Sequence, residues 1–558
     1  MNVADLLHQH ALQRGQTLAL AEPIPKKWDR SELPLNERYH CMTFAELDED
    51  SSRLAAGLLQ LGVQPGARMA LMIPPSLEFI SWVFALFKAG VVTVLIDPGM
   101  GRKNMIDCLQ RVQTEGFIGI SLAQALRVVM RHKFPLAKTN VTVGRRWFWR
   151  GPTADQLRHA SLDNFQIFQA TPNDPAAIIF TTGSTGPPKG VHYCHENFYQ
   201  QALQIQKHYN IQPGEIDLPA FPLFGLFNAA MGVTTVFPVM DPTRPAHVKP
   251  QNIIGPIQDW KISQSFGSPA LWDVVGRYCE EQDIQLPSLK RILSAGAPVP
   301  SRVLEQMSAA MLPEGEMFTP YGATEALPVA SISASEVLQE TAALTQQGYG
   351  TCVGKQFSGI QWQVIEIDDG AITAIDEAKP VETGIIGELI VQGPVVTSHY
   401  VTHAEETRMH KISDGEKFWH RMGDVGYLDG DNRFWFCGRK THRVQLADKT
   451  LFSIPLEAII NQHPTVFRSA LVGVKVDNKM AAAIVVQRWP RGQENNKSEE
   501  ITDVQLSQDI LELAAINPST ADIQYVLVKD ELPVDIRHNA KIFREKIALW
   551  AQDRIPAN

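Results

Sequence analysis

A five-residue apolar run, Ala176–Phe180, stops directly at a loop of glycines, hydroxyls and one lysine, Thr181–Gly190. An apolar run this short, with no polar alternation, predicts a strand that is buried on both faces of a sheet. Arg291–Leu293 repeats the pattern, because it ends at the small residues Ser294–Gly296. Such strands, alternating with helical patterns, indicate a doubly wound α/β sheet whose ligands bind beyond the carboxyl ends of the strands.

The pattern changes after about residue 350. Ile360, Trp362 and Val364 alternate with glutamines, and Gly387–Val391 follows, so we expect antiparallel strands with one wet face. A shorter mixed segment then closes the chain. The sequence therefore predicts an α/β protein. Its large N-terminal domain combines doubly wound sheets with an antiparallel, barrel-like part, and a small α+β C-terminal domain follows.

Charge and composition exclude several classes of protein. With 51 basic and 60 acidic side chains, the net charge of −9 argues against a general nucleic-acid binder, so any phosphate site must be made locally. The six cysteines are scattered, which is typical of reduced thiols in a cytoplasmic chain, and we expect no secretory signal. Lys88 and Gly90 interrupt the most apolar stretch, Ile80–Ile96, which favours a buried helix and strand over a membrane span.

The loop after the first strand has the chemistry of an anion site. Its three glycines let backbone amides approach an anion closely, and its four hydroxyls and one lysine add donors. It is not a Walker A loop, because Pro188 stands where that pattern requires glycine. The alternative is a surface loop of small polar residues that binds nothing.

The loop resembles the phosphate-binding motif of the adenylate-forming superfamily, which includes acyl-CoA synthetases, luciferases and peptide-synthetase adenylation domains. Other segments resemble motifs of the same family, in the family order: His195 and Asn197, Ser294–Pro298, Tyr321–Glu325, Gly423–Asp424 with Gly438–Arg439, and Leu532–Arg544. Taken singly, each could be a turn, core or surface residue. Together they identify the chain as a member of this superfamily.

The resemblance implies that the chain uses ATP and Mg²⁺ to convert a carboxylic acid into an acyl-adenylate. The implied nucleotide contacts are Thr181, Thr182, Gly183, Ser184, Thr185, Gly186 and Lys189 for the phosphates, Ala295, Gly296, Ala297, Pro298, Tyr321 and Gly322 for adenine, and Asp424 and Arg439 for ribose. Thr324 would bond the α-phosphate, and Glu325 would ligate the metal. Lys541 would bridge carboxylate and α-phosphate; the alternative is a solvated helix lysine.

The same resemblance implies a division of the chain. Residues 1–438 would form the N-terminal adenylation domain, and residues 439–441 the hinge. Residues 442–558 would form a C-terminal lid domain that carries Lys541 and rotates between two half-reactions.

Three departures from the pattern of acyl-CoA synthetases concern the second substrate. Thr441 stands where most relatives carry Asp or Lys, residues 444–452 lack the glycine of the pantetheine tunnel, and Gly225 replaces a common histidine. These positions affect thioester formation and acceptance of the acyl group, so the use of CoA as the second substrate is in doubt. Apolar residues at 221–227, Met231 and Trp272 either line an alkyl pocket or belong to the core.

Residues 186–193 and 535–545 resemble the β-lactone synthetases of bacterial olefin biosynthesis. That branch implies a long-chain 2-alkyl-3-hydroxy acid as substrate and a decarboxylase and a reductase as partners. The alternatives are a long-chain acyl-CoA synthetase, a fatty acyl-AMP ligase, or a decayed nucleotide-binding relative. Decay is disfavoured because Lys541, Glu325 and Asp424 are all present.

Overall fold

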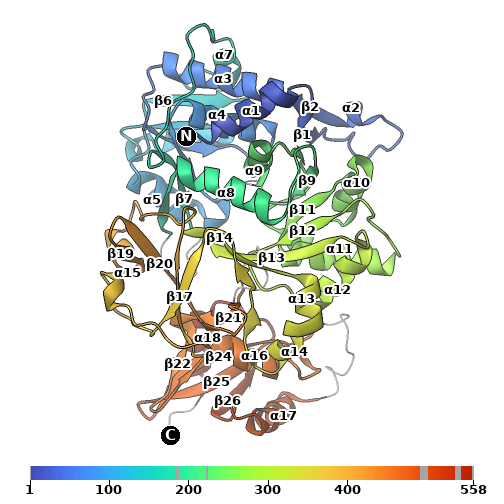
Figure 1. Cartoon of the computed structure of the whole chain (residues 1–558), viewed down its shortest axis with the longest axis vertical. Helices are drawn as coiled ribbons and strands as arrows, with labels where there is room; N and C mark the ends of the chain where they lie inside the picture. Colours follow the sequence, from blue (N-terminus) through green and yellow to red (C-terminus); the bar gives the residue numbers. More distant parts are fainter. Residues whose placement is uncertain (1, 182–187, 222–223, 491–500, 535–541, 556–558) are drawn as a thin grey trace.

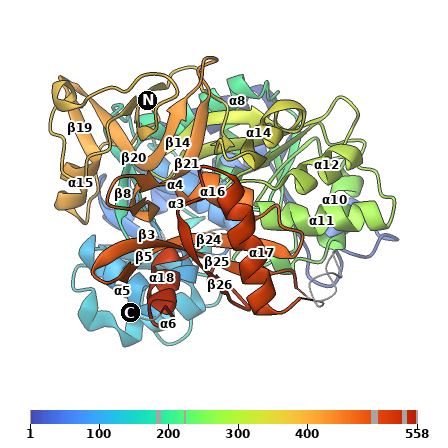
Figure 2. The same cartoon turned by 90° about the horizontal axis from the view of Figure 1, so that it is seen from below.

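The computed structural model describes residues 2–181, 188–221, 224–490, 501–534 and 542–555. Figure 1 shows two N-terminal sheets with their helices at the top, an antiparallel sheet below them, and the C-terminal elements in orange and red at the lower end. Seen from below, the C-terminal strands and helices cross the underside of the body (Figure 2). This is the α/β architecture that the sequence predicts.

The first sheet has six strands in the order β6-β5-β3-β4-β7-β8, parallel except for β8. The strands are β3 (Arg68–Met72), β4 (Val92–Leu95), β5 (Gly116–Ile120), β6 (Thr139–Val143), β7 (Pro175–Phe180) and β8 (Gly190–Cys194). The predicted strand at 176–180 is confirmed as β7, which pairs with β4 on one side and β8 on the other. The loop of glycines and hydroxyls therefore joins two neighbouring strands.

The second sheet has nine strands in the order β16-β14-β13-β12-β11-β9-β10-β1-β2, with a parallel centre and antiparallel edges. The strands are β1 (Leu18–Pro23), β2 (Tyr39–Thr43), β9 (Ile216–Pro219), β10 (Thr234–Val236), β11 (Gln264–Gly267), β12 (Arg291–Ser294), β13 (Glu316–Ala323), β14 (Ala326–Ser333) and β16 (Lys355–Gln356). The predicted strand at 291–293 is confirmed as β12, and its carboxyl end leads into Ala295.

Helices fill the space between these two sheets and bury the largest apolar cluster of the protein. They are α1 (Ala4–Arg14), α3 (Phe44–Gln60), α4 (Leu77–Lys88), α8 (His195–His208) and α9 (Phe224–Met231). The apolar stretch at 80–96 is α4 followed by β4, as expected. Lys88 is fully buried in this core, where its amine donates to Asp48 Oδ1 at 2.6 Å and Ser52 Oγ at 2.8 Å. Among the described residues, every helix is too short or too polar to span a bilayer.

Further helices cover the outer faces. Around the first sheet and the edge of the second lie α2 (Leu35–Arg38), α5 (Arg102–Arg111), α6 (Ser121–Val129) and α7 (Ala154–Leu157). On the second sheet lie α10 (Gln251–Trp260), α11 (Pro269–Glu281), α12 (Ser301–Ala310) and α13 (Ala334–Glu336), whereas α14 (Ala342–Gln346) contacts β15 and α16. Trp272 of α11 is fully buried in this outer layer, so it belongs to the core there.

The third sheet is antiparallel, as predicted, in the order β15-β21-β20-β18-β17 with β19 added on β20. Its elements are β15 (Thr351–Cys352), β17 (Gln361–Ile365), β18 (Gly387–Gln392), β19 (Lys411–Asp414), β20 (Lys417–Leu428) and β21 (Phe434–Arg439), with helix α15 (Ala404–His410). The expected wet face is wrong for β18, whose residues are all buried. Leu389 packs into the main core on one face and Ile390 into a separate cluster on the other, so this central strand is covered twice.

The C-terminal part is the small α+β unit that the sequence predicts. It contains β22 (Val444–Gln445), β23 (Thr450–Leu451), β24 (Val466–Val476), β25 (Lys479–Arg488), β26 (Ile523–Val528), α16 (Ser453–Ile460), α17 (Asp503–Ile516) and α18 (Arg544–Gln552). Glu457 of α16 is nearly buried and accepts from Arg544 Nε at 3.0 Å and Nη2 at 2.5 Å. This charge-assisted pair fixes the start of α18 against α16. The division at residues 438 and 441 remains a prediction.

A buried carboxyl group lies within the second sheet. Asp217 of β9 is 1% exposed, and its Oδ2 accepts from Asn228 Nδ2 at 2.6 Å. Burial raises the pKa of Asp217 to about 7, against the opposing effects of Asn228 and Arg291. Arg291 Nη1 donates to Glu215 Oε2 at 2.9 Å and to Gln264 Oε1 at 2.8 Å. The carboxyl group therefore titrates near neutral pH.

Asp217 makes the stability of the protein depend on pH. The folded state keeps the Asp217 proton up to about pH 7, whereas the unfolded chain releases it near pH 4, the usual aspartate value. The stabilisation is therefore complete below about pH 4 and is lost as the pH rises through 7. We predict that between pH 5 and 8 the melting temperature of the wild type falls relative to that of Asp217→Asn. Parallel pH profiles of the two proteins would contradict this assignment.

Candidate functional site

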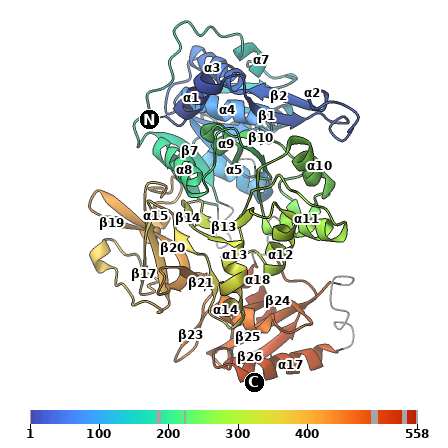
Figure 3. The same ribbon diagram turned by 45° about the vertical axis from the view of Figure 1, so that its right-hand side comes forward.

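Those predicted nucleotide-binding residues that the structure describes lie where the three large sheets meet. β7 and β8 flank the 181–190 loop, β12 to β14 carry the segments at 294–298 and 321–325, and β20 and β21 carry Asp424 and Arg439. Figure 3 shows β13, β14, β20 and β21 between the N-terminal helices and the C-terminal unit. The fold thus gathers segments that are more than 250 residues apart in the sequence.

The ends of the predicted phosphate loop are joined by two hydrogen bonds. The Thr181 amide donates to the Lys189 carbonyl at 3.0 Å, and the Lys189 amide donates to Thr181 Oγ1 at 3.4 Å. The loop therefore leaves β7 and returns to β8 at the same point. The remaining predicted loop contacts lie outside the described residues: Thr182, Gly183, Ser184, Thr185 and Gly186.

The amine of Lys189, which is predicted to contact phosphate, is held by a carboxylate. Its Nζ lies 2.5 Å from Glu406 Oε2 and 5.4 Å from the centroid of the Tyr400 ring. His410 Nε2 lies 3.3 Å from the same Glu406 oxygen. An incoming phosphate would have to replace Glu406 as the partner of Lys189. Glu406 was not among the predicted site residues.

The predicted adenine turn and the aromatic residue beside it lie at one sheet edge. Residues 295–298 follow β12, and β12 pairs in parallel with β13, which carries Tyr321 and Gly322. Gly296 has φ +99°, a conformation that disfavours any other residue, so the turn keeps its backbone open. The structure therefore brings the predicted adenine contacts to the carboxyl ends of neighbouring strands.

The predicted ribose pair is bound to Tyr321. Asp424 and Arg439 are register partners on β20 and β21, and Arg439 Nη1 lies 3.0 Å from Asp424 Oδ1. The Tyr321 hydroxyl donates to Asp424 Oδ2. Burial and the Asp424 charge raise the pKa of Tyr321 well above its usual value, so the phenol stays protonated and remains a donor. The sequence predicts a ring that stacks on adenine, but the structure adds this contact through its hydroxyl.

Thr324 and Glu325 form the turn between β13 and β14, and contacts from β8 and from residues 397–400 hold them. The Tyr193 hydroxyl of β8 donates to the Thr324 carbonyl at 2.5 Å. The Thr397 amide and hydroxyl donate to the Glu325 carbonyl at 2.9 and 3.0 Å. The Tyr400 hydroxyl donates to Glu325 Oε1 at 2.7 Å. The predicted metal carboxylate is therefore fixed in both backbone and side chain.

Residues 396–402 form a segment, here called the strap, that ties Glu325 to the phosphate loop. Val401 donates through its amide to the Gly190 carbonyl at 2.8 Å, and the Gly190 amide donates to Thr402 Oγ1 at 3.0 Å. Tyr400 bridges to Val191 of β8. Sequence reasoning missed the strap, because its contacts with Glu325 and Gly190 join residues 72 to 212 positions apart and no local pattern marks them.

A buried amine lies beside the strap. Lys411 Nζ donates to the Thr397 carbonyl. Burial lowers the pKa of Lys411 to about 7, while the negative charge of Glu325 acts in the opposite direction. At neutral pH this amine therefore gains or loses its proton readily when its surroundings change. It lies close to the charge of Glu325, the carboxylate that is predicted to bind a metal.

The residues present fit magnesium that arrives with a nucleotide. Among the described residues, no group of three or more histidine, cysteine or acidic side chains could hold a metal ion alone. Glu325 offers one carboxylate, with one oxygen already bonded to Tyr400. Magnesium in nucleotide sites commonly binds one or two carboxylates together with phosphate oxygens and water. A single carboxylate beside a phosphate loop is the donor set expected for that arrangement.

A small cavity lies beside β9, β11 and β12 of the second sheet. It has a volume of about 10 Å³, enough for one water molecule, and Phe224, Met231, Leu293 and Asp217 are among its lining residues. Phe224 stacks on Phe266 with 3.7 Å between the ring centroids. This cavity is therefore too small to hold an alkyl chain. Part of the apolar segment at 221–227, residues 222 and 223, lies outside the described residues.

Lys541, the predicted bridging residue, lies outside the described residues. The chain is described again from Ile542, whose backbone bridges to Val534. Three residues after Lys541, Arg544 is fixed by its pair with Glu457. The two ends of the segment that carries Lys541 are therefore anchored to the C-terminal unit.

Glu406 should compete with phosphate for Lys189. We predict that Glu406→Gln lowers the KM for ATP about two- to five-fold, because a partly exposed ion pair of this kind contributes about 0.2–1 kcal/mol. Glu405→Gln is the matched control, since Glu405 is on the same helix but pairs with Arg408. Steady-state kinetics at saturating acid provide the measurement. A raised KM in Glu406→Gln would mean that Glu406 orients Lys189 for ATP instead of competing with it.

Residues 11–401 match the family described as AMP-binding enzyme. An olefin beta-lactone synthetase from Xanthomonas campestris pv. campestris is 42% identical over 521 residues, 92% of this chain and 92% of that protein. Another olefin beta-lactone synthetase, from Stenotrophomonas maltophilia, is 42% identical over 516 residues, 91% of this chain and 91% of that protein.

Among solved structures, ATP-bound MatB from Rhodopseudomonas palustris superposes with a TM-score of 0.77 at 19% identity, covering 99% of this chain and 100% of that one. At that identity the likeness establishes the fold. The family match spans well over half of the chain, and the two synthetases match about nine-tenths of it. This chain therefore belongs to the AMP-binding enzymes.

Proposed function

We propose that this enzyme adenylates a long-chain 2-alkyl-3-hydroxy fatty acid and then closes it to a β-lactone, releasing AMP and pyrophosphate. The observation that carries the proposal is the 42% identity to two olefin beta-lactone synthetases over more than nine-tenths of the chain. The acid-activating site described above supplies the first half of this reaction. The departures at Thr441, Gly225 and residues 444–452 fit a reaction without CoA.

In the adenylation step the acid carboxylate attacks the α-phosphorus of ATP, and the bond to pyrophosphate breaks. The 181–189 loop and Lys189 would hold the outer phosphates once Glu406 is displaced. Thr324 would donate to the α-phosphate. Lys541 would neutralise negative charge between the α-phosphate and the carboxylate of the acid. Mg²⁺, when bound, would offset phosphate charge. Glu325, oriented by Tyr400 and Thr397, would provide the protein ligand for it.

In the second step the 3-hydroxyl oxygen attacks the activated carbonyl carbon. The bond between that carbon and the AMP oxygen breaks, AMP leaves with the electron pair, and the hydroxyl proton is released. Because the nucleophile and the electrophile belong to one molecule, positioning replaces the binding of a second substrate. Water competes for the same carbonyl, so the site must exclude it. Breaking the adenylate would also offset the strain of the four-membered ring.

The C-terminal unit is proposed to act as the lid, with residues 439–441 as hinge. Two contacts near this point support a defined orientation: Lys440 Nζ lies 3.0 Å from the buried Glu388 carboxylate, and Arg443 pairs with Asp369 at 2.5 Å. We also propose that the enzyme works in the cytoplasm with a decarboxylase and a reductase of the same pathway. The free thiols of all six cysteines fit a reducing compartment.

The products distinguish lactone synthesis from thioester or carrier-protein chemistry. We predict that a long-chain 2-alkyl-3-hydroxy acid with ATP and Mg²⁺ yields β-lactone and AMP in equal amounts without CoA. The matching acid without the 3-hydroxyl should give at most one equivalent of pyrophosphate per enzyme and no free AMP, because no internal nucleophile displaces AMP from the adenylate. Mass spectrometry of the lipid and chromatography of AMP provide the readouts. Preferential thioester formation when CoA is added would contradict the proposal.

Lys541 is proposed to act in adenylation. We predict that Lys541→Ala slows acid-dependent exchange of pyrophosphate into ATP by about 100- to 1,000-fold, the usual cost of losing one preorganised donor. Lys546→Ala is the control, because Lys546 is exposed on α18 with its amine 4.6 Å from the centroid of the Phe543 ring. Equal exchange rates in the two variants would remove Lys541 from the mechanism.

A further inference from the structure

One stretch of the chain has a charge opposite to that of the whole protein. Residues 116–154 contain seven lysines and arginines and no aspartate or glutamate, although the chain has a net charge of −9. The seven are Arg127, Arg131, Lys133, Lys138, Arg145, Arg146 and Arg150. Within the described part of the chain, no ion pair with a carboxylate is formed by any of them. The proposed reaction leaves this positive charge unexplained.

Aromatic side chains lie among these charges on the loop between β6 and α7. The sequence from 145 to 150 is Arg-Arg-Trp-Phe-Trp-Arg. Trp149 is buried and its Nε1 donates to Thr142 Oγ1 at 2.8 Å, which fixes the loop to β6. Trp147 and Phe148 pack against Trp149 with ring centroids 5.4 and 5.3 Å away, yet they are 50% and 78% exposed. The loop therefore holds two large apolar rings in solvent on a rigid base.

Helix α6 and the turn after it extend this surface. Ser121 at the start of α6 donates through Oγ to the Arg145 carbonyl, so the helix and the aromatic loop are joined. Leu122 and Val129 of α6 are 70% and 76% exposed, and Leu136 is 46% exposed. These residues and the loop form what we call the basic–aromatic surface. Its exposed members are Leu122, Val129, Arg131, Leu136, Lys138, Arg145, Arg146, Trp147, Phe148 and Arg150.

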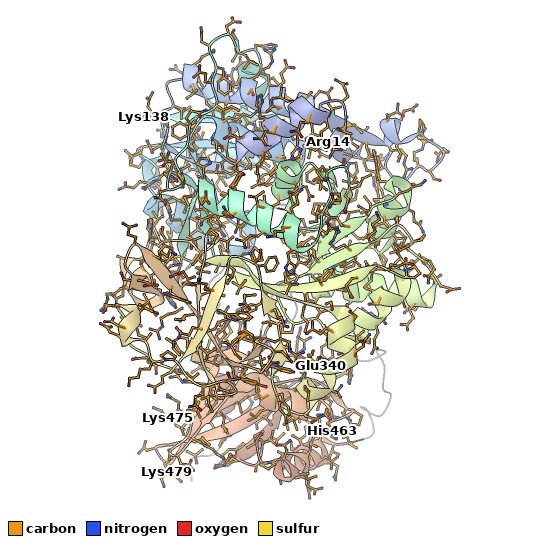
Figure 4. All side chains as sticks on the ribbon, in the orientation of Figure 1. Arg14, Lys138, Glu340, His463, Lys475 and Lys479 are labelled. Carbon is orange, nitrogen blue, oxygen red and sulfur yellow. The ribbon has the colours of Figure 1, made fainter. Side chains whose placement is uncertain are left out.

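The basic–aromatic surface is remote from the C-terminal lid. Figure 4 shows Lys138 at the upper end of the molecule, far from Lys475 and Lys479 of the C-terminal unit at the lower end. A ligand bound at this surface would therefore leave the proposed lid movement free. β6 is also an edge strand of its sheet, so this side of the domain faces outward.

We propose that the basic–aromatic surface docks the enzyme onto an anionic lipid bilayer. Each lysine or arginine near such a surface adds electrostatic attraction, and the seven basic residues here are opposed by no acid within the stretch. Tryptophan and phenylalanine insert at the level of the lipid headgroups. Because their rings are largely apolar, leaving water costs them little free energy. The combination of both on one rigid face matches the charge and polarity of that interface.

The proposal does not depend on lactone formation. It accounts for exposed rings that would otherwise carry a cost in solubility, because apolar patches on soluble monomers generally mark an interaction site. A long-chain acid would also collect in the same bilayer, so docking would bring the enzyme to its substrate. An acidic protein partner would also be attracted by the charges, and the experiment below separates the two.

Vesicle flotation with the full-length protein tests the proposal. We expect the protein to float with phosphatidylcholine vesicles that contain about 30 mol% phosphatidylglycerol and to stay behind with pure phosphatidylcholine. About 0.5 M salt should release most of it, because screening weakens the attraction. Arg145→Gln combined with Arg146→Gln should weaken partitioning by about 30-fold, the fold-change equivalent to about 2 kcal/mol. Trp147→Ser combined with Phe148→Ser should also weaken it.

Lys475→Gln with Lys479→Gln is the matched control, because both lysines are exposed and the charge change is the same. This control should float like the wild type. All variants should keep the wild-type melting temperature and rate of AMP formation, since none alters the proposed active site. Equal binding to both vesicle types, no binding to either, or wild-type binding by the surface variants would overturn the proposal. So would capture by an acidic protein without any vesicle binding.

Discussion

Three tyrosine hydroxyls join the three sheets around the proposed active site. Tyr193 of the first sheet donates to the Thr324 carbonyl, Tyr321 of the second donates to Asp424 of the third, and Tyr400 of the strap donates to Glu325. Each hydroxyl is buried enough that losing its partner would leave a polar group without water. Because the predicted phosphate, metal and ribose contacts lie on different sheets, their relative positions depend on these three bonds.

Within this frame the charges of the site are paired with one another. Lys189 is held by Glu406, and Arg439 by Asp424, while Lys411 lies beside Glu325 at a pKa near 7. A protein with net charge −9 has no general attraction for a polyanion, so these local cations must provide it. Nucleotide binding then becomes an exchange of carboxylate partners for phosphate ones. Such an exchange limits the affinity for the nucleotide, because the carboxylate contacts are lost when the phosphate contacts form. It also means that the cations of the site are paired before the nucleotide binds.

Sequence reasoning predicted the parts of this site that are continuous in the chain. The strand at 176–180, the turn at 294–298 and the segment at 321–325 carry local patterns of apolar runs and glycines, and the structure places all three at strand ends. It did not predict Glu406, Tyr400 or Lys411, because their partners are set by sheet packing. It also failed for β18, since the covering of both faces depends on neighbours that are distant in sequence. Roles for Thr182–Gly186 and Lys541 stay predictions.

We propose that the acid is activated through its own carboxylate at this junction of three sheets. Labelling both carboxylate oxygens of a 2-alkyl-3-hydroxy acid with ¹⁸O tests it most directly. If the carboxylate attacks the α-phosphate, one label must leave in AMP, the other must remain in the lactone carbonyl, and the ring oxygen must be unlabelled. If ATP instead activated the hydroxyl, AMP would carry no label and both labelled oxygens would stay in the lactone. Unlabelled AMP would therefore show that the carboxylate is not the group that ATP activates.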